Sequence, residues 1–235
     1  MKYAIIAAGD GRRLSAEGVS EPKPLVRVGG ECLVDRLIRI FMNNRAEEII
    51  VICNDHTPLV PRHLVALQRD GLKGRPVPLR FVVKSTPSSM HSFFEISKYL
   101  TDGPFILTTV DTIFREDEFA EYVRTFQQFK GDGLMGVTEF VDDEKPLYVE
   151  TDEQMTITGF RDEPNSSHYV SGGIYGLNES AIFTLNNCIA RSENRMRNFQ
   201  RALVADRRVL KAWSFSKILD IDHADDIIKA NEYLQ

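Results

Sequence analysis

Cysteine is scarce in this chain of 235 residues: the three present, Cys32, Cys53 and Cys188, are scattered and form no CxxC pair. This pattern excludes a disulfide framework and argues against a zinc site. Long hydrophobic runs are also missing, since none reaches the roughly 18 residues that a membrane-spanning helix needs. The opening residues, MKYAIIAAG, lack the small-residue cleavage site of a signal peptide. We therefore expect a cytoplasmic protein that does not enter a membrane.

The chain has no excess of positive charge. It carries 29 lysines and arginines against 34 acidic residues, which gives a formal charge of −5. Broad electrostatic attraction to nucleic acid or to a membrane surface is therefore not expected, and any bound anion must be held locally. The composition is otherwise that of a globular protein, with 43% hydrophobic and 27% charged residues and no internal repeat.

Short apolar runs alternate with amphipathic segments over the first 130 residues. We expect strands at 3–8, 48–54, 79–84 and 104–111, and helices at 33–44, after Pro61 to Gly71, at 88–100 and at 115–129. This alternation predicts a mainly parallel sheet with helices on both faces, a three-layer, Rossmann-like α/β fold.

The second half of the sequence is richer in strand patterns. Strands are expected at 134–141, 147–152, 155–160, 171–177 and 209–215, and helices at 179–192, 197–206 and 224–234. We interpret these strands as mixed or antiparallel additions to the same sheet. The prediction is therefore one α/β domain spanning residues 1–235, with a β-rich second half.

A glycine loop follows the first predicted strand, within AIIAAGDGRRL (residues 4–14). Gly9 and Gly11 allow a tight turn whose backbone N–H groups can face an anion. The dinucleotide fingerprint would need glycine at the position of Leu14, and the P-loop pattern is absent. Taken alone, the two glycines are equally compatible with a plain turn.

Three cations surround this loop in the sequence. Arg12 and Arg13 follow Gly11 directly, and Lys23 lies between Pro22 and Pro24, which restrict its backbone. These side chains are either solvated loop cations or part of a triphosphate site, in which amides and fixed cations stabilise the charge that develops during transfer.

The segment from Ile6 to Leu14, followed by Pro22-Lys23, resembles the signature of nucleotidyltransferases that join an NTP to a sugar 1-phosphate or another phosphorylated alcohol. The resemblance implies that Arg13 and Lys23 are catalytic and neutralise charge at the α phosphate. It also implies a nucleotide-binding set, in which the first two residues lie near the base and the others wrap the triphosphate: Ala7, Ala8, Gly9, Asp10, Gly11 and Arg12.

A triphosphate that reacts at its α phosphorus needs Mg²⁺, which takes carboxylate oxygens as ligands. Asp111 ends a predicted strand at the same sheet edge as the glycine loop, and the family has an aspartate there. Capping of the following turn is the alternative role. Related enzymes carry a second metal carboxylate at the position of either Asp220 or Asp222. We favour Asp222, which can also be a helix N-cap, and keep Asp220 as the second choice.

The base and the second substrate are less clearly marked. The resemblance places Ser88 and Ser89 in a loop that reads the base, although an N-capped helix explains these serines as well. Gly172 and Gly173 match a family strand that lines the acceptor pocket. The family lysine that contacts the acceptor phosphate is replaced by Glu163. This departure leaves open which acceptor is used: a hexose 1-phosphate, a heptose 1-phosphate, or a phospho-alcohol such as phosphocholine.

The resemblance implies a Mg²⁺-dependent nucleotidyltransferase that releases pyrophosphate, acting as a monomer or homodimer. Residues 1–130 would bind the NTP, and residues 131–235 would bind the phosphorylated acceptor and supply the C-terminal metal ligand. Two alternatives are a non-catalytic NTP-binding regulatory protein and an NAD(P)-dependent oxidoreductase. The second is disfavoured by Leu14 and because Asp55 is only a weak candidate for the acid that binds a ribose.

Overall fold

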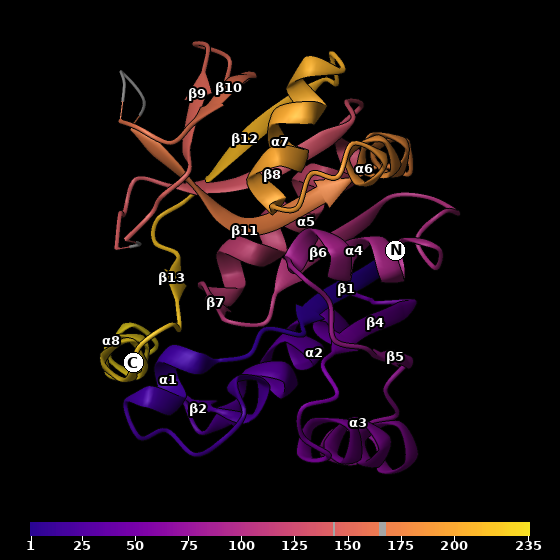
Figure 1. Cartoon of the computed structure of the whole chain (residues 1–235), viewed down its shortest axis with the longest axis vertical. Helices are drawn as coiled ribbons and strands as arrows, with labels where there is room; N and C mark the ends of the chain where they lie inside the picture. The colour runs from indigo at the N-terminus through magenta and orange to yellow at the C-terminus, as the bar shows by residue number, and fades with distance from the viewer. Residues whose placement is uncertain (143, 165–167) are drawn as a thin grey trace.

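A nine-stranded mixed sheet forms the centre of the computed structural model, which describes residues 1–142, 144–164 and 168–235 (Figure 1). The elements in chain order are β1 (Lys2–Ala7), α1 (Arg12–Ala16), the 3-10 turn η1 (Lys23–Leu25), β2 (Arg27–Val28), β3 (Glu31–Cys32), α2 (Leu33–Asn43), β4 (Glu48–Cys53), α3 (Leu59–Asp70), β5 (Leu79–Val83), α4 (Ser89–Ser97), β6 (Phe105–Thr109), β7 (Thr112–Ile113), α5 (Glu116–Gln128), β8 (Gly133–Thr138), β9 (Tyr148–Thr151), β10 (Ile157–Arg161), β11 (Tyr169–Leu177), α6 (Ser180–Ala190), α7 (Met196–Ala205), β12 (Leu210–Phe215), β13 (Leu219–Asp220) and α8 (Ala224–Tyr233).

The sheet is parallel in the first half of the chain and mixed in the second. Its order is β10-β9-β11-β6-β1-β4-β5, and β8 pairs with both β11 and β12. Strands β6, β1, β4 and β5 are parallel to one another, whereas β11 is antiparallel to β6, β8 and β9. The predicted β-rich additions to a parallel core are therefore confirmed, and both halves of the chain contribute to one sheet.

Helices cover the two faces of the sheet, as the three-layer prediction requires. Alternate residues of β1 point to opposite faces: Tyr3 and Ile5 belong to one buried cluster, and Ala4 and Ile6 to the other. The first cluster is covered by α2, α3, α5 and α8, and the second by α4, α6 and α7. Burial on both faces explains why the central strands read as continuous apolar runs.

The predicted elements are all present, with shifts at their ends. Helix α3 begins at Leu59, before Pro61, because a proline in the first helical turn displaces no intrahelical donor. Ser88 caps α4, since its hydroxyl accepts a hydrogen bond from the backbone N–H of His91. The N-cap of α8 is His223, not Asp222. The sequence patterns missed the short elements α1, η1, β2, β3, β7 and β13.

The C-terminal segment crosses the molecule and returns to the glycine loop. β13 pairs with β7, directly after β6, and α8 lies beside α1 (Figure 1). Residues more than 200 positions apart are in contact there. The Glu17 carboxylate accepts hydrogen bonds from the His223 ring and from the backbone N–H of Ala224, each at 2.6 Å. Among the described residues, no helix has the length and apolar character needed to cross a membrane.

Candidate functional site

The candidate site lies where the strand order of the parallel core changes direction. The chain passes from β1 to β4 and β5 on one side, and then returns to β6 on the other side of β1. The loops that leave β1 and β6 therefore diverge at the carboxyl end of the sheet. This topology opens a crevice at a place where α/β proteins commonly bind ligands.

The glycine loop adopts the open turn expected from its residues. Gly11 has φ +62°, and a Cβ at this position would lie 3.2 Å from the Cβ of Lys23, so the conformation and the close packing both favour glycine. Gly9 instead faces open space. Asn54, at the end of β4, supports the loop by donating hydrogen bonds to the carbonyls of Ala8 and Gly9 at 3.3 and 3.1 Å. The predicted loop is thus supported by Asn54 on one side, and its other side, at Gly9, is open.

Lys23 joins two aspartates that are distant in the sequence. Its Nζ lies 2.5 Å from Oδ2 of Asp111 and 2.7 Å from Oδ1 of Asp222. The Arg13 guanidinium lies 2.7 Å from the other oxygen of Asp222. We call Arg13, Lys23, Asp111 and Asp222 the Lys23 cluster. The predicted catalytic cations and the favoured carboxylates therefore meet at one point.

Charge within the Lys23 cluster changes the proton affinities of its members. Burial alone would lower the pKa of Lys23, whose side chain is 10% exposed, but the charges of Asp111 and Asp222 outweigh burial and raise it. Burial likewise acts to raise the pKa of Asp222, and the nearby Lys23 charge reverses that effect and lowers it. Lys23 is therefore a cation and Asp222 an anion at neutral pH.

The donor set of the Lys23 cluster fits a hard divalent cation. Oδ1 of Asp111 is buried and has no hydrogen-bond partner within the described part of the chain. A buried carboxylate oxygen without a donor is costly, and a cation with oxygen ligands would satisfy it. Asp111 and Asp222 supply two carboxylates, which suits Mg²⁺ when phosphate oxygens and waters complete the shell. Described residues contain no cluster of three or more acidic, histidine or cysteine ligands.

Asp220 lies apart from this bridge. It sits at the end of β13, where it pairs with Thr112 of β7, and its side chain lines two cavities that flank the Lys23 cluster. The structure thus places the two candidates differently. Asp222 is joined to Asp111 through Lys23, whereas Asp220 faces the neighbouring space.

Two cavities adjoin the Lys23 cluster along the sheet edge. The first, here called the loop cavity, has a volume of about 260 Å³ and is lined by the glycine loop, the start of α4 and the end of β6. Ala8, Gly9, Ser88 and Ser89 all lie on its wall. The second, here called the α7 cavity, has a volume of about 330 Å³ and extends from Asp111 to the start of α7. Asp111 lines both, so each cavity can present a ligand to the same carboxylate.

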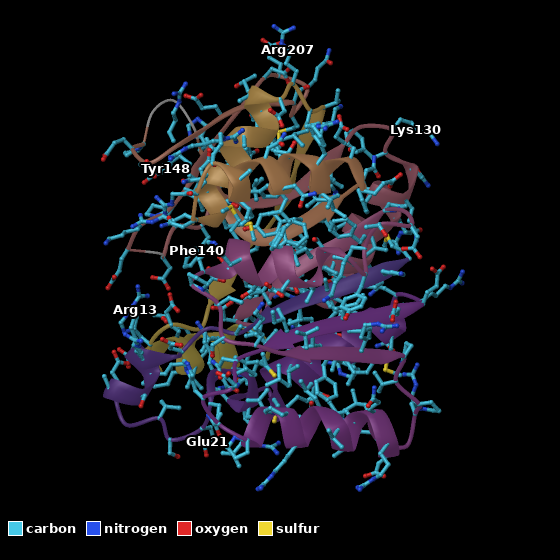
Figure 2. All side chains as sticks on the ribbon, turned by 45° about the vertical axis from the view of Figure 1, so that its right-hand side comes forward. Arg13, Glu21, Lys130, Phe140, Tyr148 and Arg207 are labelled. Atoms are coloured by element: carbon cyan, nitrogen blue, oxygen red, sulfur yellow. The ribbon has the colours of Figure 1, made fainter. Side chains whose placement is uncertain are left out.

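A third cavity lies on the other side of β13. Its volume is about 230 Å³, and it is lined by Arg13, Phe140, Gly172 and acidic residues of α8. Figure 2 shows Arg13 and Phe140 on the same edge of the molecule. Gly172 lies here and not in the α7 cavity, because it packs against the side chain of Ile218.

Other predicted site residues are placed as follows. Arg12 does not reach the Lys23 cluster: its side chain is 87% exposed and pairs with Asp10 at 2.8 Å. Ala7 is the last residue of β1, and its side chain is buried in the first cluster. The hydroxyl of Ser88 is used by its own helix cap. Gly173, with φ +71°, lines the α7 cavity, and a Cβ there would come within 2.9 Å of two threonine hydroxyls.

Several residues at the site were not predicted from the sequence. Gln200 is 2% exposed and lines the α7 cavity, together with Arg195 and Arg197. A helix pattern at 197–206 had been expected, and the arginines at its start were the available hint. Asn54 holds the glycine loop through backbone carbonyls, and Glu17 contacts both the backbone and the His223 ring; no sequence motif marks either residue.

Comparisons with known proteins agree with this geometry. A family model described as "Nucleotidyl transferase" matches residues 2–235. A curated relative, the bifunctional protein GlmU of Methanocaldococcus jannaschii, is 22% identical over 241 residues, covering 100% of this chain and 54% of its own length. The chain therefore spans about half the length of this relative.

Solved structures share the fold at low sequence identity. A protein assigned as a glucose-1-phosphate thymidylyltransferase from Bacillus anthracis superimposes with a TM-score of 0.85 at 20% identity, over 99% of this chain and 94% of that one. The inositol-1-phosphate CTP transferase of T. maritima gives a TM-score of 0.78 at 19% identity, over 98% and 96% of the two chains. These similarities establish the Rossmann-like fold.

Proposed function

Because the chain belongs to the nucleotidyl transferase family, we propose that it transfers a nucleotidyl group from an NTP to a phosphorylated small molecule. The observation that carries this proposal is the position of Lys23 Nζ between Asp111 and Asp222, at 2.5 and 2.7 Å. Asp111 lines both the loop cavity and the α7 cavity, and Lys23 lines the loop cavity, so we assign one of these cavities to each substrate. Glucose-1-phosphate and inositol-1-phosphate, named for the two similar structures, represent the acceptor classes to test first.

In the proposed reaction, an oxygen of the acceptor phosphate attacks the α phosphorus of the NTP. The new bond joins that oxygen to the α phosphorus, the bond from the α phosphorus to the bridging oxygen of the β phosphate breaks, and pyrophosphate leaves with the electron pair. A phosphate monoester is largely anionic at neutral pH, so no side chain has to act as nucleophile. Catalysis would come from alignment and charge neutralisation.

The loop cavity would hold the nucleotide. Backbone amides from Gly9 to Arg13 would contact the triphosphate, and Ala8, Ser88 and Ser89 would lie near the base and ribose. The same nucleotide-binding segment includes Ala7, whose backbone would lie near the base, and the Asp10–Arg12 ion pair on its outer surface. Arg13 and Lys23 would neutralise charge at the reacting phosphate.

Magnesium is the cofactor that we propose for this site. Asp111 and Asp222 would hold it, with Asp220 as the nearest further carboxylate, and the ion would supply Lewis-acid stabilisation of the phosphate charge. In this proposal residues 1–130 bind the NTP, and residues 131–235 bind the acceptor and supply Asp222. The chain would act in the cytoplasm as a monomer or homodimer, without nucleic acid.

Pyrophosphate release tests the proposal directly. Purified protein is incubated with Mg²⁺, each of the four NTPs and each of a set of acceptors, namely glucose 1-phosphate, inositol 1-phosphate and phosphocholine. At least one pair should release pyrophosphate, and Asp111→Ala should lower that rate by orders of magnitude with an unchanged circular dichroism spectrum. A protein that binds NTP tightly but releases no pyrophosphate with any acceptor would be the regulatory alternative, which the acidic Asp162-Glu163 pair makes reasonable.

A further inference from the structure

Arg36, in the first half of α2, places a charged side chain within the hydrophobic core. It is 3% exposed, and it is the only charged residue among the buried ones that the structure describes. The carboxylate of Glu116 lies 3.9 Å from its Nη2, and its Nη1 is buried without a hydrogen-bond partner in the described ranges. A buried charge with an unused donor is costly, and apolar side chains of similar volume often replace such groups without loss of stability. Packing alone therefore does not account for an arginine at this position.

Arg36 contacts both the backbone and the side chain of Phe114, the residue that follows β7. Its Nη2 donates a hydrogen bond to the backbone carbonyl of Phe114 at 2.7 Å. The guanidinium carbon lies 5.4 Å from the centre of the Phe114 ring, a distance at which a cation is attracted to the face of an aromatic ring. Phe114 in turn stacks on Phe119 of α5, with 4.8 Å between the ring centres. The end of β7 is therefore fixed from α2.

Strand β7 lies between this anchor and the two aspartates of the Lys23 cluster. It begins directly after Asp111 and ends directly before Phe114, and its partner β13 ends two residues before Asp222. The backbone N–H of Ile221 donates a hydrogen bond to the carbonyl of Asp111 at 3.1 Å, which links the two carboxylate-bearing segments. A pair of two-residue strands has little stability of its own, so contacts at its ends must hold it in place.

Arg36 lies outside the three cavities that adjoin the Lys23 cluster, so it has no direct route to a ligand there. A second arginine on the same helix gives a useful contrast. Arg39 forms ion pairs with Glu31 and Glu116, each at 2.7 Å, and its side chain is 24% exposed. It therefore binds the first turn of α5 through a side chain, whereas Arg36 binds the backbone at the end of β7.

We propose that Arg36 is a positioning residue, which fixes Asp111 and Asp222 relative to each other by anchoring the end of β7. A hydrogen bond from a charged donor is about twice as strong as a neutral one, which suits an anchor for so short a strand. The catalytic consequence rests on the proposed function, in which these two carboxylates hold the metal ion. A misplacement of about 1 Å in a site can lower a rate by about 10²-fold.

Amide hydrogen exchange followed by NMR tests the anchor without any substrate. Arg36→Met keeps most of the side-chain volume and removes the donor to the Phe114 carbonyl. The Ile221 N–H should then exchange at least about tenfold faster, as expected for loss of one charged hydrogen bond, while amides of β8 and β12 change by less than about 2-fold. Arg39→Met is the matched control, since it removes the same charge from the same helix and should leave Ile221 within about 2-fold of the wild type. If Arg36→Met does not fold, Arg36→Lys, which keeps the charge on a shorter side chain, is held to the same threshold.

Kinetics with an active NTP and acceptor pair tests the catalytic consequence. Arg36→Met should lower kcat and raise the Mg²⁺ concentration for half-maximal rate, each by about tenfold or more, because the two carboxylates are no longer held in place. The KM for the NTP should change by less than about 2-fold, since the glycine loop is untouched.

Two results would overturn the inference. One is Ile221 exchange in Arg36→Met that equals that of the wild type or of Arg39→Met. The other is faster exchange with an unchanged kcat and an unchanged Mg²⁺ requirement. Absence of pyrophosphate release by the wild type would instead count against the proposed function, and the exchange measurement would still decide whether Arg36 anchors β7.

Discussion

Replacing Lys23 by methionine removes the cation that joins the two aspartates and keeps most of the side-chain volume. Lys23 is 10% exposed, and it faces Asp111, which is 19% exposed, and Asp222, which is 39% exposed. Removing one partner of a fully buried ion pair costs about 3–5 kcal/mol. Since Asp222 remains partly solvated, we expect a smaller loss of about 2 kcal/mol in the free energy of unfolding.

Thermal unfolding measures this loss. For a chain of this size, 2 kcal/mol corresponds to a fall in Tm of about 4–8 °C. The measurement is made first in EDTA, where the two carboxylates of Lys23→Met have no counter-charge. Added Mg²⁺ should then raise the Tm of the variant more than that of the wild type, because the ion replaces the missing cation. Activity should not recover in parallel, and kcat should stay lower by about 10²–10³-fold, as for loss of a charge-stabilising donor.

Lys130→Met is the matched control, because Lys130 lies on the opposite side of the molecule from Arg13 (Figure 2). Its Tm and its response to Mg²⁺ should equal those of the wild type. The reasoning would be refuted if Lys23→Met unfolded at the wild-type temperature in EDTA, or if Mg²⁺ shifted both proteins equally. Either result would mean that Lys23 and the ion do not serve the same two carboxylates.

Three further predictions concern the loop, the charge network and the thiols. Gly11→Ala, at φ +62°, should destabilise the fold by about 1 kcal/mol or more and weaken NTP binding, whereas Gly9→Ala, facing open space, should leave the urea midpoint unchanged. Burial acts to raise the pKa of Glu31, but hydrogen bonds from Arg39 outweigh it and lower the pKa, so its contribution is complete above the unfolded value and is lost as pH falls through the folded one. Glu31→Gln should therefore lower the free energy of unfolding at pH 7 and have little effect at pH 3 in urea titrations. Burial raises the pKa of Cys53 to about 11, so at pH 8 native protein should react with a thiol reagent at least about a hundredfold more slowly than unfolded protein; equal rates would contradict the burial.

The fold could be predicted because its main elements have strong local signals. Buried parallel strands such as Ile49–Cys53 read as uninterrupted apolar runs, and α2 carries its apolar residues at helical spacing. Short elements such as β7 and β13 have no such signal, since two residues show no periodicity. They form where distant parts of the chain meet, as when Leu219 pairs with Ile113.

Site residues could be predicted from the sequence where a chemically suitable side chain or glycine follows a predicted strand or lies in a recognisable motif. Gly11 follows β1 and Asp111 follows β6, which are neighbouring strands of the parallel core, so their meeting at one sheet edge follows from the topology. Lys23 lies in η1 and was predictable from its motif instead. The different positions of Asp220 and Asp222 could not be predicted in this way. It depends on the direction in which β13 leaves β7, which a two-residue pairing fixes and no motif records.

Contacts across the site join the N-terminal glycine loop to the C-terminal segment around α8. The glycine loop carries Arg13 and the C-terminal segment carries Asp222, and these side chains form an ion pair. Behind them Glu17 accepts hydrogen bonds from the His223 ring and from the first backbone N–H of α8. A carboxylate at the start of a helix also favours the helix dipole. The start of α8 also has a local cap, because the Asp226 side chain accepts a hydrogen bond from the backbone N–H of His223 at 2.8 Å, and Glu17, which follows α1, adds a long-range cap. The loop and α1 that follows it therefore shape the proposed triphosphate site and, through Arg13 and Glu17, hold the segment that supplies the proposed second metal ligand.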